Sequence, residues 1–181
     1  MSDVDGCYLD QTSDFPRICR IPLSASGKPL YNHHNFDAWW GSHWSLDILW
    51  SMAYPHLMDD FCNTMLDMYR NGGLIPRGPS GGNYTYVMIG DPAVSFFATA
   101  YNKGIRNYDA DLAYEGLRKN AFPGGIRDHA GYEHSKDAHS GGMEYYIKMG
   151  YVPDGRANVV GMHTTGASMT LEYAYQDWCL A

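Results

Sequence analysis

The last segment of the chain, residues 165–181, carries side chains that could hold a hard cation. Glu172 and Gln176 are four residues apart and share one face of an expected helix, with Asp177 adjacent. Oxygen-bearing groups on one surface suit calcium, although the spacing alone is more typical of a solvated polar stripe. Aromatic residues surround these groups. Burial of Glu172 without a partner would therefore be costly, which favours a functional role.

A second group of ionisable residues lies in the irregular stretch 127–139. It includes Asp128, His129, Glu133, His134 and His139. These residue types can bind a metal, but they lack the helical His-x-x-x-His spacing of many metal sites. The pattern is most typical of an exposed polar loop, and a substrate-facing loop is the second interpretation.

The segment Gly72–Ala93 joins two expected helices and is rich in glycine and proline. Long connections of this kind are either disordered or functional, and the aromatic and aliphatic residues at 84 and 86–89 argue against disorder. Its glycines would let the backbone approach a ligand closely. Ser80 does not lie in a nucleophile-elbow pattern, and no Lys-Ser/Thr pair follows the glycines. Serine hydrolase and nucleotide-binding functions are therefore not indicated.

The elements that must position these groups are helical. Periodicity and capping signals predict helices at residues 37–54, 57–71, 92–104, from 109 or 111 to 122, 143–149 and from about 166 to the terminus. Residues 1–36 are expected to be mostly loop, with room for a short strand. Helix pairs joined by alternating short and long connections suit an all-α fold, either a helical hairpin array or an α/α toroid.

Composition narrows the function further. The 181 residues include 45% hydrophobic and 18% charged residues, which are globular values. A net charge of -7 without a basic stripe argues against nucleic acid as a partner. No apolar run reaches membrane-spanning length. Aromatic residues make up 14%, as suits a carbohydrate site or an aromatic core. The four cysteines lack zinc-site spacing, and a Cys7–Cys19 disulfide and free thiols both stay open.

Taken in order, several segments resemble one family. They are Asp3–Gly6, the loop Gly72–Asp91, Tyr101–Arg106, Gly150–Pro153 and Glu172–Ala181. This order resembles the catalytic domain of family 92 glycoside hydrolases, which are calcium-dependent, inverting exo-α-mannosidases. The resemblance implies part of an (α/α)6 toroid acting on α-mannosides or related glycans. Since that domain is much longer and follows a β-sandwich domain, residues 1–181 are expected to be a fragment of a protein that is secreted or periplasmic.

The resemblance also assigns the acid position, and this chain departs from the family there. The family places its general acid in a Gly-Asn-Glu-Thr motif, which reads Gly82-Asn83-Tyr84-Thr85 here. Tyr84 therefore stands where a glutamate is expected, and a tyrosine with a pKa near 10 gives up a proton far less readily. Three alternatives follow: a substrate with a better leaving group, a substitute acid such as Glu133, or a sugar-binding relative without catalysis.

Other site residues follow from the same resemblance. Glu172 resembles a calcium ligand and Asp177 would support it, while Gln176 replaces the first aspartate of an Asp-Asp-Trp motif. The sugar subsite would be lined by Trp44, Asp47, Asn83 and Asp91. The general base is expected beyond Ala181. An inverting reaction needs such a second carboxylate to activate water.

Overall fold

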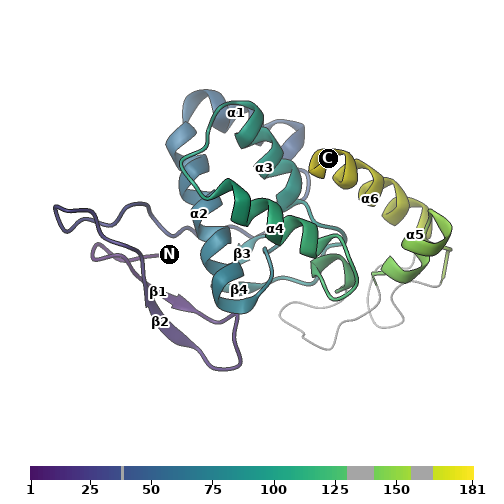
Figure 1. Ribbon diagram of the computed structural model, residues 1–181, viewed down its shortest axis with the longest axis horizontal. Helices are drawn as coiled ribbons and strands as arrows, with labels where there is room; N and C mark the ends of the chain where they lie inside the picture. Colours follow the sequence, from purple (N-terminus) through teal and green to yellow (C-terminus); the bar gives the residue numbers. More distant parts are fainter. Residues whose placement is uncertain (38, 130–140, 156–164) are drawn as a thin grey trace.

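The computed structural model describes residues 1–37, 39–129, 141–155 and 165–181, and this part of the protein is mainly helical (Figure 1). The helices are α1 (Leu46–Ala53), α2 (Pro55–Gly72), α3 (Ala93–Asn102), α4 (Ala110–Asn120), α5 (Met143–Met149) and α6 (Gly166–Leu180). The 3₁₀ turns η1 (Ser42–Trp44) and η2 (Ile126–Asp128) accompany them. Strands β1 (Cys7–Asp10) and β2 (Arg17–Arg20) form one antiparallel hairpin, and β3 (Pro79–Ser80) and β4 (Asn83–Tyr84) form another. The predicted helical fold is therefore confirmed.

Helix α2 is the central element of the core. Its buried face recurs with helical spacing and consists of Met58, Phe61, Cys62, Met65 and Leu66. Pro55 stands in the first turn, where a missing N–H removes no helical hydrogen bond. Gly73 ends the helix in the left-handed conformation at φ 85°. The predicted end of this helix is thus confirmed, with Gly72 inside it.

Trp39 fills the middle of the core and is fully buried. The rings of Phe36, Trp50, Phe61 and Phe96 surround it at centroid distances of 4.3 to 6.3 Å. Its backbone N–H donates to the carbonyl of Arg77 at 2.8 Å, so the core also anchors the glycine-rich loop. Large buried rings dominate the energetics of such a core.

The prediction of one buried helix over residues 37–54 is confirmed only from Leu46 onward. Gly41 adopts a left-handed conformation at φ 80°, and η1 replaces the expected first turns. After this turn Trp44 is 69% exposed, whereas Trp39 before it is buried. Periodicity could not show this break, because a single glycine is tolerated inside a helical pattern.

The register of the β1–β2 hairpin decides between a Cys7–Cys19 disulfide and two free thiols. Cys7 lies opposite Arg20 and Tyr8 lies opposite Cys19 in the strand register. Because side chains of adjacent positions point to opposite faces of a sheet, Cys7 and Cys19 point to opposite faces. Both thiols are free.

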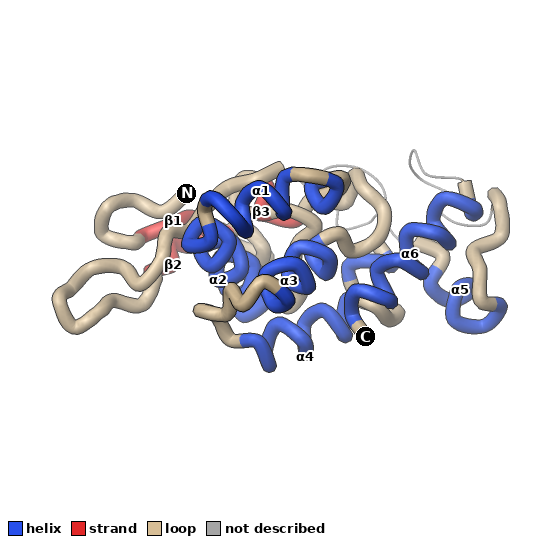
Figure 2. Tube along the Cα trace, turned by 90° about the horizontal axis from the view of Figure 1, so that it is seen from above, coloured by secondary structure: helices blue, strands red, loops and turns tan. Residues whose placement is uncertain are grey.

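Helix α6 packs mainly on α3, and α5 lies beside its first turns. In both views the β1–β2 hairpin and the α5–α6 pair lie at opposite ends of the molecule (Figure 1 and Figure 2). Helix α4 begins with Asp109, whose carboxylate accepts the Leu112 N–H at 3.0 Å, as its N-cap signal predicts. The predicted helices at 143–149 and from about 166 are also confirmed.

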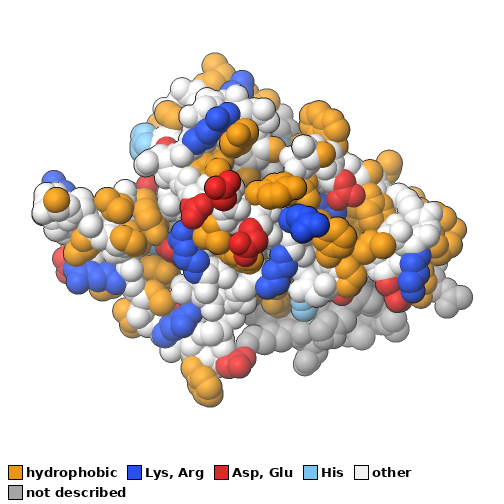
Figure 3. Space-filling model, viewed as in Figure 1, with side chains coloured by type: hydrophobic (Ala, Val, Ile, Leu, Met, Phe, Trp, Pro, Cys, Tyr) orange, Lys and Arg blue, Asp and Glu red, His pale blue; other side chains and the backbone are white. Residues whose placement is uncertain are grey.

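The surface gives two further findings. Acidic and basic side chains are interspersed on the face shown in Figure 3, without a continuous basic stripe. Within the described ranges, no helix has the length and apolar character needed to cross a membrane.

Candidate functional site

Five polar residues gather where the end of the glycine-rich loop, η2 and α6 meet. We call them the α6 polar cluster, which consists of Asp91, Arg127, Glu172, Gln176 and Asp177. Two of the predicted metal ligands and one of the predicted sugar-binding residues therefore lie in one region.

Gln176 is the link between the loop and the helix. It is fully buried, its Oε1 accepts the Asp91 N–H at 2.7 Å, and its Nε2 donates to Glu172 Oε1 at 2.8 Å. A side chain at Gly90 would place a Cβ 2.5 Å from Gln176 Nε2. The glycine is therefore required for this close approach, as its positive φ of 73° also indicates.

Arg127 pairs with Asp177. Its Nη1 lies 2.5 Å from Asp177 Oδ1, and its side chain is 1% exposed against 44% for the aspartate. The hydroxyl of Tyr146 donates to the other carboxylate oxygen of Asp177 at 2.9 Å. Both oxygens of Asp177 thus already have donors.

The remaining two carboxylates of the cluster are shifted in the same direction. Burial raises the pKa of Asp91 to about 6, while the charge of Arg127, the Asn120 side chain and Arg77 lower it in part. Neither Asp91 oxygen accepts a hydrogen bond of ordinary geometry from a described residue. Burial also raises the pKa of Glu172, and the Gln176 hydrogen bond and Arg127 oppose that shift.

Asp47 is a further buried carboxylate, placed by the first turn of α1. Burial raises its pKa to about 6, with a smaller opposing effect of Ser42, and neither oxygen has a hydrogen bond of ordinary geometry to a described residue. The Tyr175 ring of α6 lies 5.0 Å from that of His43, whose ring lies 5.6 Å from that of the exposed Trp44. The structure therefore brings η1, with Trp44, to the flank of α6, and Asp47 follows it in the first turn of α1.

The Tyr84 side chain points toward the end of α2. Its side chain is 2% exposed, and its hydroxyl lies 3.0 Å from the carbonyls of Met68 and Leu74 at the end of α2. Burial raises the pKa of this phenol above its ordinary value. Asn83 is half-buried, and its Oδ1 accepts the Tyr84 N–H at 2.8 Å. The role of Tyr84 as acid stays a prediction, but this geometry favours a structural role.

Glu133, the predicted substitute acid, lies outside the described residues, as do His134 and His139.

The donor set on α6 does not fit a calcium ion. Calcium takes six to eight oxygen ligands. Here Asp177 is occupied by Arg127 and Tyr146, and one oxygen of Glu172 accepts from Gln176. The three carboxylates of the α6 polar cluster do not form a group that could hold one metal ion, and no other three His, Cys, Asp or Glu side chains of the described residues do so. We therefore derive no step of a reaction from calcium.

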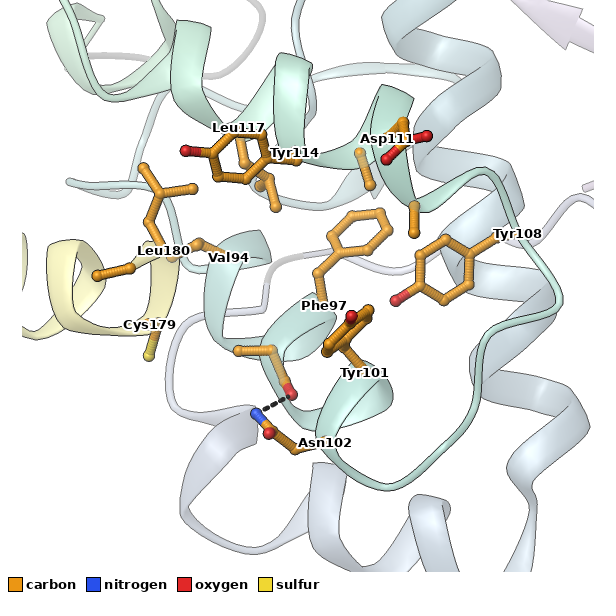
Figure 4. Close-up of a pocket in the computed structure, with 14 residues that line it drawn as sticks. Val94, Phe97, Tyr101, Asn102, Tyr108, Asp111, Tyr114, Leu117, Cys179 and Leu180 are labelled. Atoms are coloured by element: carbon orange, nitrogen blue, oxygen red, sulfur yellow. Dashed lines mark hydrogen bonds between the residues drawn. The ribbon is translucent and has the colours of Figure 1, made fainter.

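Two cavities lie away from this cluster. One of about 470 Å³ opens between α3, α4 and the end of α6, and apolar and tyrosine side chains line it together with Asn102 and Asp111 (Figure 4). Another of about 370 Å³ lies beside Tyr84, with Thr12, Asn71, Tyr86 and His129 among its lining residues. Neither contains Asp47, Asp91, Glu172 or Asp177.

Sequence reasoning missed the two buried arginines. Arg77 is fully buried, and it donates to the carbonyls of Gly90 at 2.8 Å and Ile126 at 2.7 Å, and to that of His129. It thereby fixes the loop that carries Asp91 against η2. Since arginines are rarely fully buried, only their position within glycine-rich segments could have drawn attention to them.

Comparisons with known proteins point to one family. The chain matches the model of the glycosyl hydrolase family 92 catalytic domain over residues 7–181. It is 30% identical over 135 residues to an uncharacterized secreted glycosidase of Arthroderma benhamiae, and this match covers 73% of the chain and 16% of that relative.

Solved structures of the same family share the fold. The family GH92 α-mannosidase BT3965 from Bacteroides thetaiotaomicron, solved in complex with mannoimidazole, has a TM-score of 0.72 at 24% identity. The inverting family GH92 mannosidase BT2199 from that organism has a TM-score of 0.63 at 23% identity. These matches cover 99% and 87% of this chain, but only 20% and 21% of the two relatives. Because the family model matches nearly the whole of this chain, residues 7–181, the chain belongs to glycosyl hydrolase family 92.

Proposed function

We propose that the protein is a glycosidase acting on α-mannosides or related glycans, and that this chain supplies part of its sugar-binding surface. The observation that carries this proposal is the aromatic surface around Trp44. The Trp44 ring is 69% exposed and lies 5.6 Å from that of His43, which lies 5.0 Å from that of Tyr175. A sugar offers hydroxyls to a carboxylate and C–H faces to aromatic rings.

The other site residues take supporting roles in this proposal. Glu172 is half-buried on the same helix as Tyr175, three residues away, and can accept hydrogen bonds from sugar hydroxyls. Asp47 and Asp91 are both fully buried, so they support this surface from beneath instead of touching the sugar, Asp91 through its backbone bond to Gln176. Asn83 is half-buried and is kept as a sugar-binding residue.

Proton donation is the step for which this chain is least suited. An inverting glycosidase protonates the leaving oxygen with one carboxylic acid and activates water with a second carboxylate. The hydroxyl of Tyr84 faces the end of α2, and its raised pKa makes it a poor donor near neutral pH. We therefore propose that the preferred substrate has a good leaving group, with Glu133 as the alternative acid. The base belongs to another part of the full-length protein.

A series of aryl α-mannosides with graded leaving groups tests this proposal on the full-length protein. We expect kcat/KM to fall steeply as the leaving group becomes more basic, because little proton transfer assists its departure. A shallow dependence that becomes steep in Glu133→Gln would instead assign the acid to Glu133. Absence of turnover for every substrate would overturn the enzymatic proposal.

The buried hydroxyl of Tyr84 also favours a second candidate, a sugar-binding protein without catalysis. Isothermal titration of an α-mannoside separates the two. This candidate predicts measurable binding without turnover, unchanged in Glu133→Gln.

Three expectations about the whole protein complete the proposal. Its helices would form one sector of an (α/α)6 toroid, and the chain spans 20% of the length of the solved α-mannosidase it resembles. The full-length protein would be secreted, in line with the name of its fungal relative. A calcium requirement stays a prediction, and the contacts of Asp177 speak against this residue as a ligand.

A further inference from the structure

The α6 polar cluster contains a permanent positive charge of its own. Arg127 extends from η2 with a side chain that is 1% exposed, and an arginine stays protonated in proteins. Its Nη1 lies 2.5 Å from Asp177 Oδ1. Burial is the main influence on the pKa of Asp91 and of Glu172, and the charge of Arg127 opposes it in both. The carboxylate that this guanidinium contacts directly is that of Asp177.

The neighbouring contacts already use both oxygens of Asp177 and one oxygen of Glu172, which a second cation would need. Tyr146 donates to Asp177 Oδ2, and Gln176 uses both ends of its amide, one for the Asp91 N–H and one for Glu172. A divalent ion bound to Asp177 would have to displace Arg127 or lie beside its charge in a region of low dielectric. Like charges at such short range repel strongly.

We propose that Arg127 takes the place of a divalent cation in this protein and is the positioning residue of the α6 polar cluster. Its guanidinium holds Asp177 directly, and Gln176 joins Asp91 to Glu172 in the same cluster. The cluster is then assembled by folding alone, without a metal. This inference concerns the assembly of the site and does not depend on glycosidase activity.

Calcium binding and thermal unfolding of the full-length protein test the inference. We expect the melting temperature of the wild type to be the same in EGTA and in excess calcium, and terbium luminescence to show no binding that Asp177→Asn removes. Calcium stabilisation or terbium binding that Asp177→Asn or Glu172→Gln abolishes would overturn the inference. A calcium effect that survives both substitutions places the ion elsewhere and supports it.

Variants of Arg127 give an independent measurement. Arg127→Met removes the charge and should lower the melting temperature in EGTA, whereas Arg127→Lys retains the charge and should recover part of the loss. Arg118→Met is the matched control, because Arg118 is an exposed arginine on α4. Equal melting temperatures of Arg127→Met and Arg118→Met would contradict the inference. Should Arg127→Met fail to fold, the wild-type and Asp177→Asn calcium measurements still decide the question.

Neither readout uses turnover. A protein that hydrolyses no α-mannoside can still have Asp177 paired with Arg127 and no calcium there. Conversely, an active enzyme can still prove to bind calcium at Asp177. Failure of the proposed function and failure of this inference are therefore distinguishable.

Discussion

The hydroxyl of Tyr84 accepts a hydrogen bond from the backbone N–H of Leu74 at 3.1 Å and lies 3.0 Å from the carbonyl of the same residue. The loop strand β4 is thereby fastened to the first residues after α2. The residue that the resemblance predicts at the acid position thus makes contacts that hold the loop in place.

Removal of this hydroxyl should affect stability more than catalysis. Tyr84→Phe leaves buried backbone groups of Leu74 without their partner, which costs about 1 to 3 kcal/mol. Urea unfolding measures this loss, and hydrolysis of activated aryl α-mannosides should stay near wild-type rates. A large drop in kcat with unchanged stability would show that Tyr84 is the proton donor after all.

Gly72 and Tyr84 should be energetically coupled. A Cβ at Gly72 would lie 2.4 Å from the Tyr84 hydroxyl and 2.5 Å from Thr12 Cβ, so Gly72→Ala overpacks this contact. We expect a loss of about 1 to 3 kcal/mol from overpacking. The loss should be smaller in the Tyr84→Phe background, because one of the two clashing groups is then absent. A double-mutant cycle by urea unfolding measures this coupling, and strict additivity of the two changes would contradict it.

Asp67 should make stability fall as pH rises. Burial raises its pKa to about 6, although hydrogen bonds from Tyr31 and the nearby Arg70 oppose the shift. Between roughly pH 4 and this value, the folded protein binds more protons than the unfolded chain, so the free energy of unfolding decreases with pH. Asp67→Asn should remove on the order of 1 to 3 kcal/mol of this dependence, measured by urea unfolding from about pH 4 to 7.

Asp60 is the control for this pH dependence, because its pKa shift has the opposite sign. Burial raises the pKa of Asp60, but hydrogen bonds with His34 and Asn32 outweigh burial and lower it. Its contribution is present above the unfolded pKa and is lost as pH falls, so Asp60→Asn should alter the acid side of the curve. An unchanged slope in Asp67→Asn would exclude Asp67 as the source.

Substitution of two tryptophans that are close in sequence should have different effects, one on sugar binding and the other on stability. Trp44→Ala removes an exposed ring, so stability should change by no more than about 0.5 kcal/mol. Its loss should weaken α-mannoside binding by about 0.5 to 1.5 kcal/mol. Trp39→Ala empties the core and should cost about 3 to 5 kcal/mol of stability. Calorimetric titration and urea unfolding of both variants test this contrast. Wild-type affinity in Trp44→Ala would remove Trp44 from the sugar site.

Asp47→Asn should separate binding from stability. The carboxylate is fully buried without an ordinary hydrogen bond to a described residue, so its neutralisation should raise the melting temperature at neutral pH. Because the carboxylate lies beneath the sugar-binding surface, the affinity for α-mannosides should stay near that of the wild type. A variant that is destabilised at neutral pH, or that loses α-mannoside affinity, would contradict the proposed role.

Much of the fold follows from local signals in the chain. Helices α2, α4, α5 and α6 have apolar periodicity with glycine, proline or aspartate at their ends, and those signals act over a few residues. The β1–β2 hairpin was harder to predict, because its strands have four residues each and β2 is mostly exposed. The turn at Gly41 was missed since aromatic residues on both sides are compatible with a helix.

The sequence indicated that Glu172 and Asp177 lie close together on one helix, but it did not indicate that an arginine pairs with Asp177. Glu172 was recognised as costly to bury, and the structure gives it a partner in Gln176. The pairing of Asp177 with Arg127 joins residues 50 positions apart, which no local pattern in a single sequence reveals. The direction of the Tyr84 side chain was hidden for the same reason, since its partners lie at the end of a preceding helix.

The bond from the Asp91 N–H to Gln176 Oε1, described above as a link between loop and helix, also makes one amide proton a reporter of docking. Gln176 is fully buried and reaches this N–H only while α6 is packed on α3. Hydrogen exchange at Asp91 should therefore be slow in the native protein and should speed up whenever α6 detaches, even if α3 stays folded. The exchange rate of this one amide would then measure how often helix α6 detaches from α3.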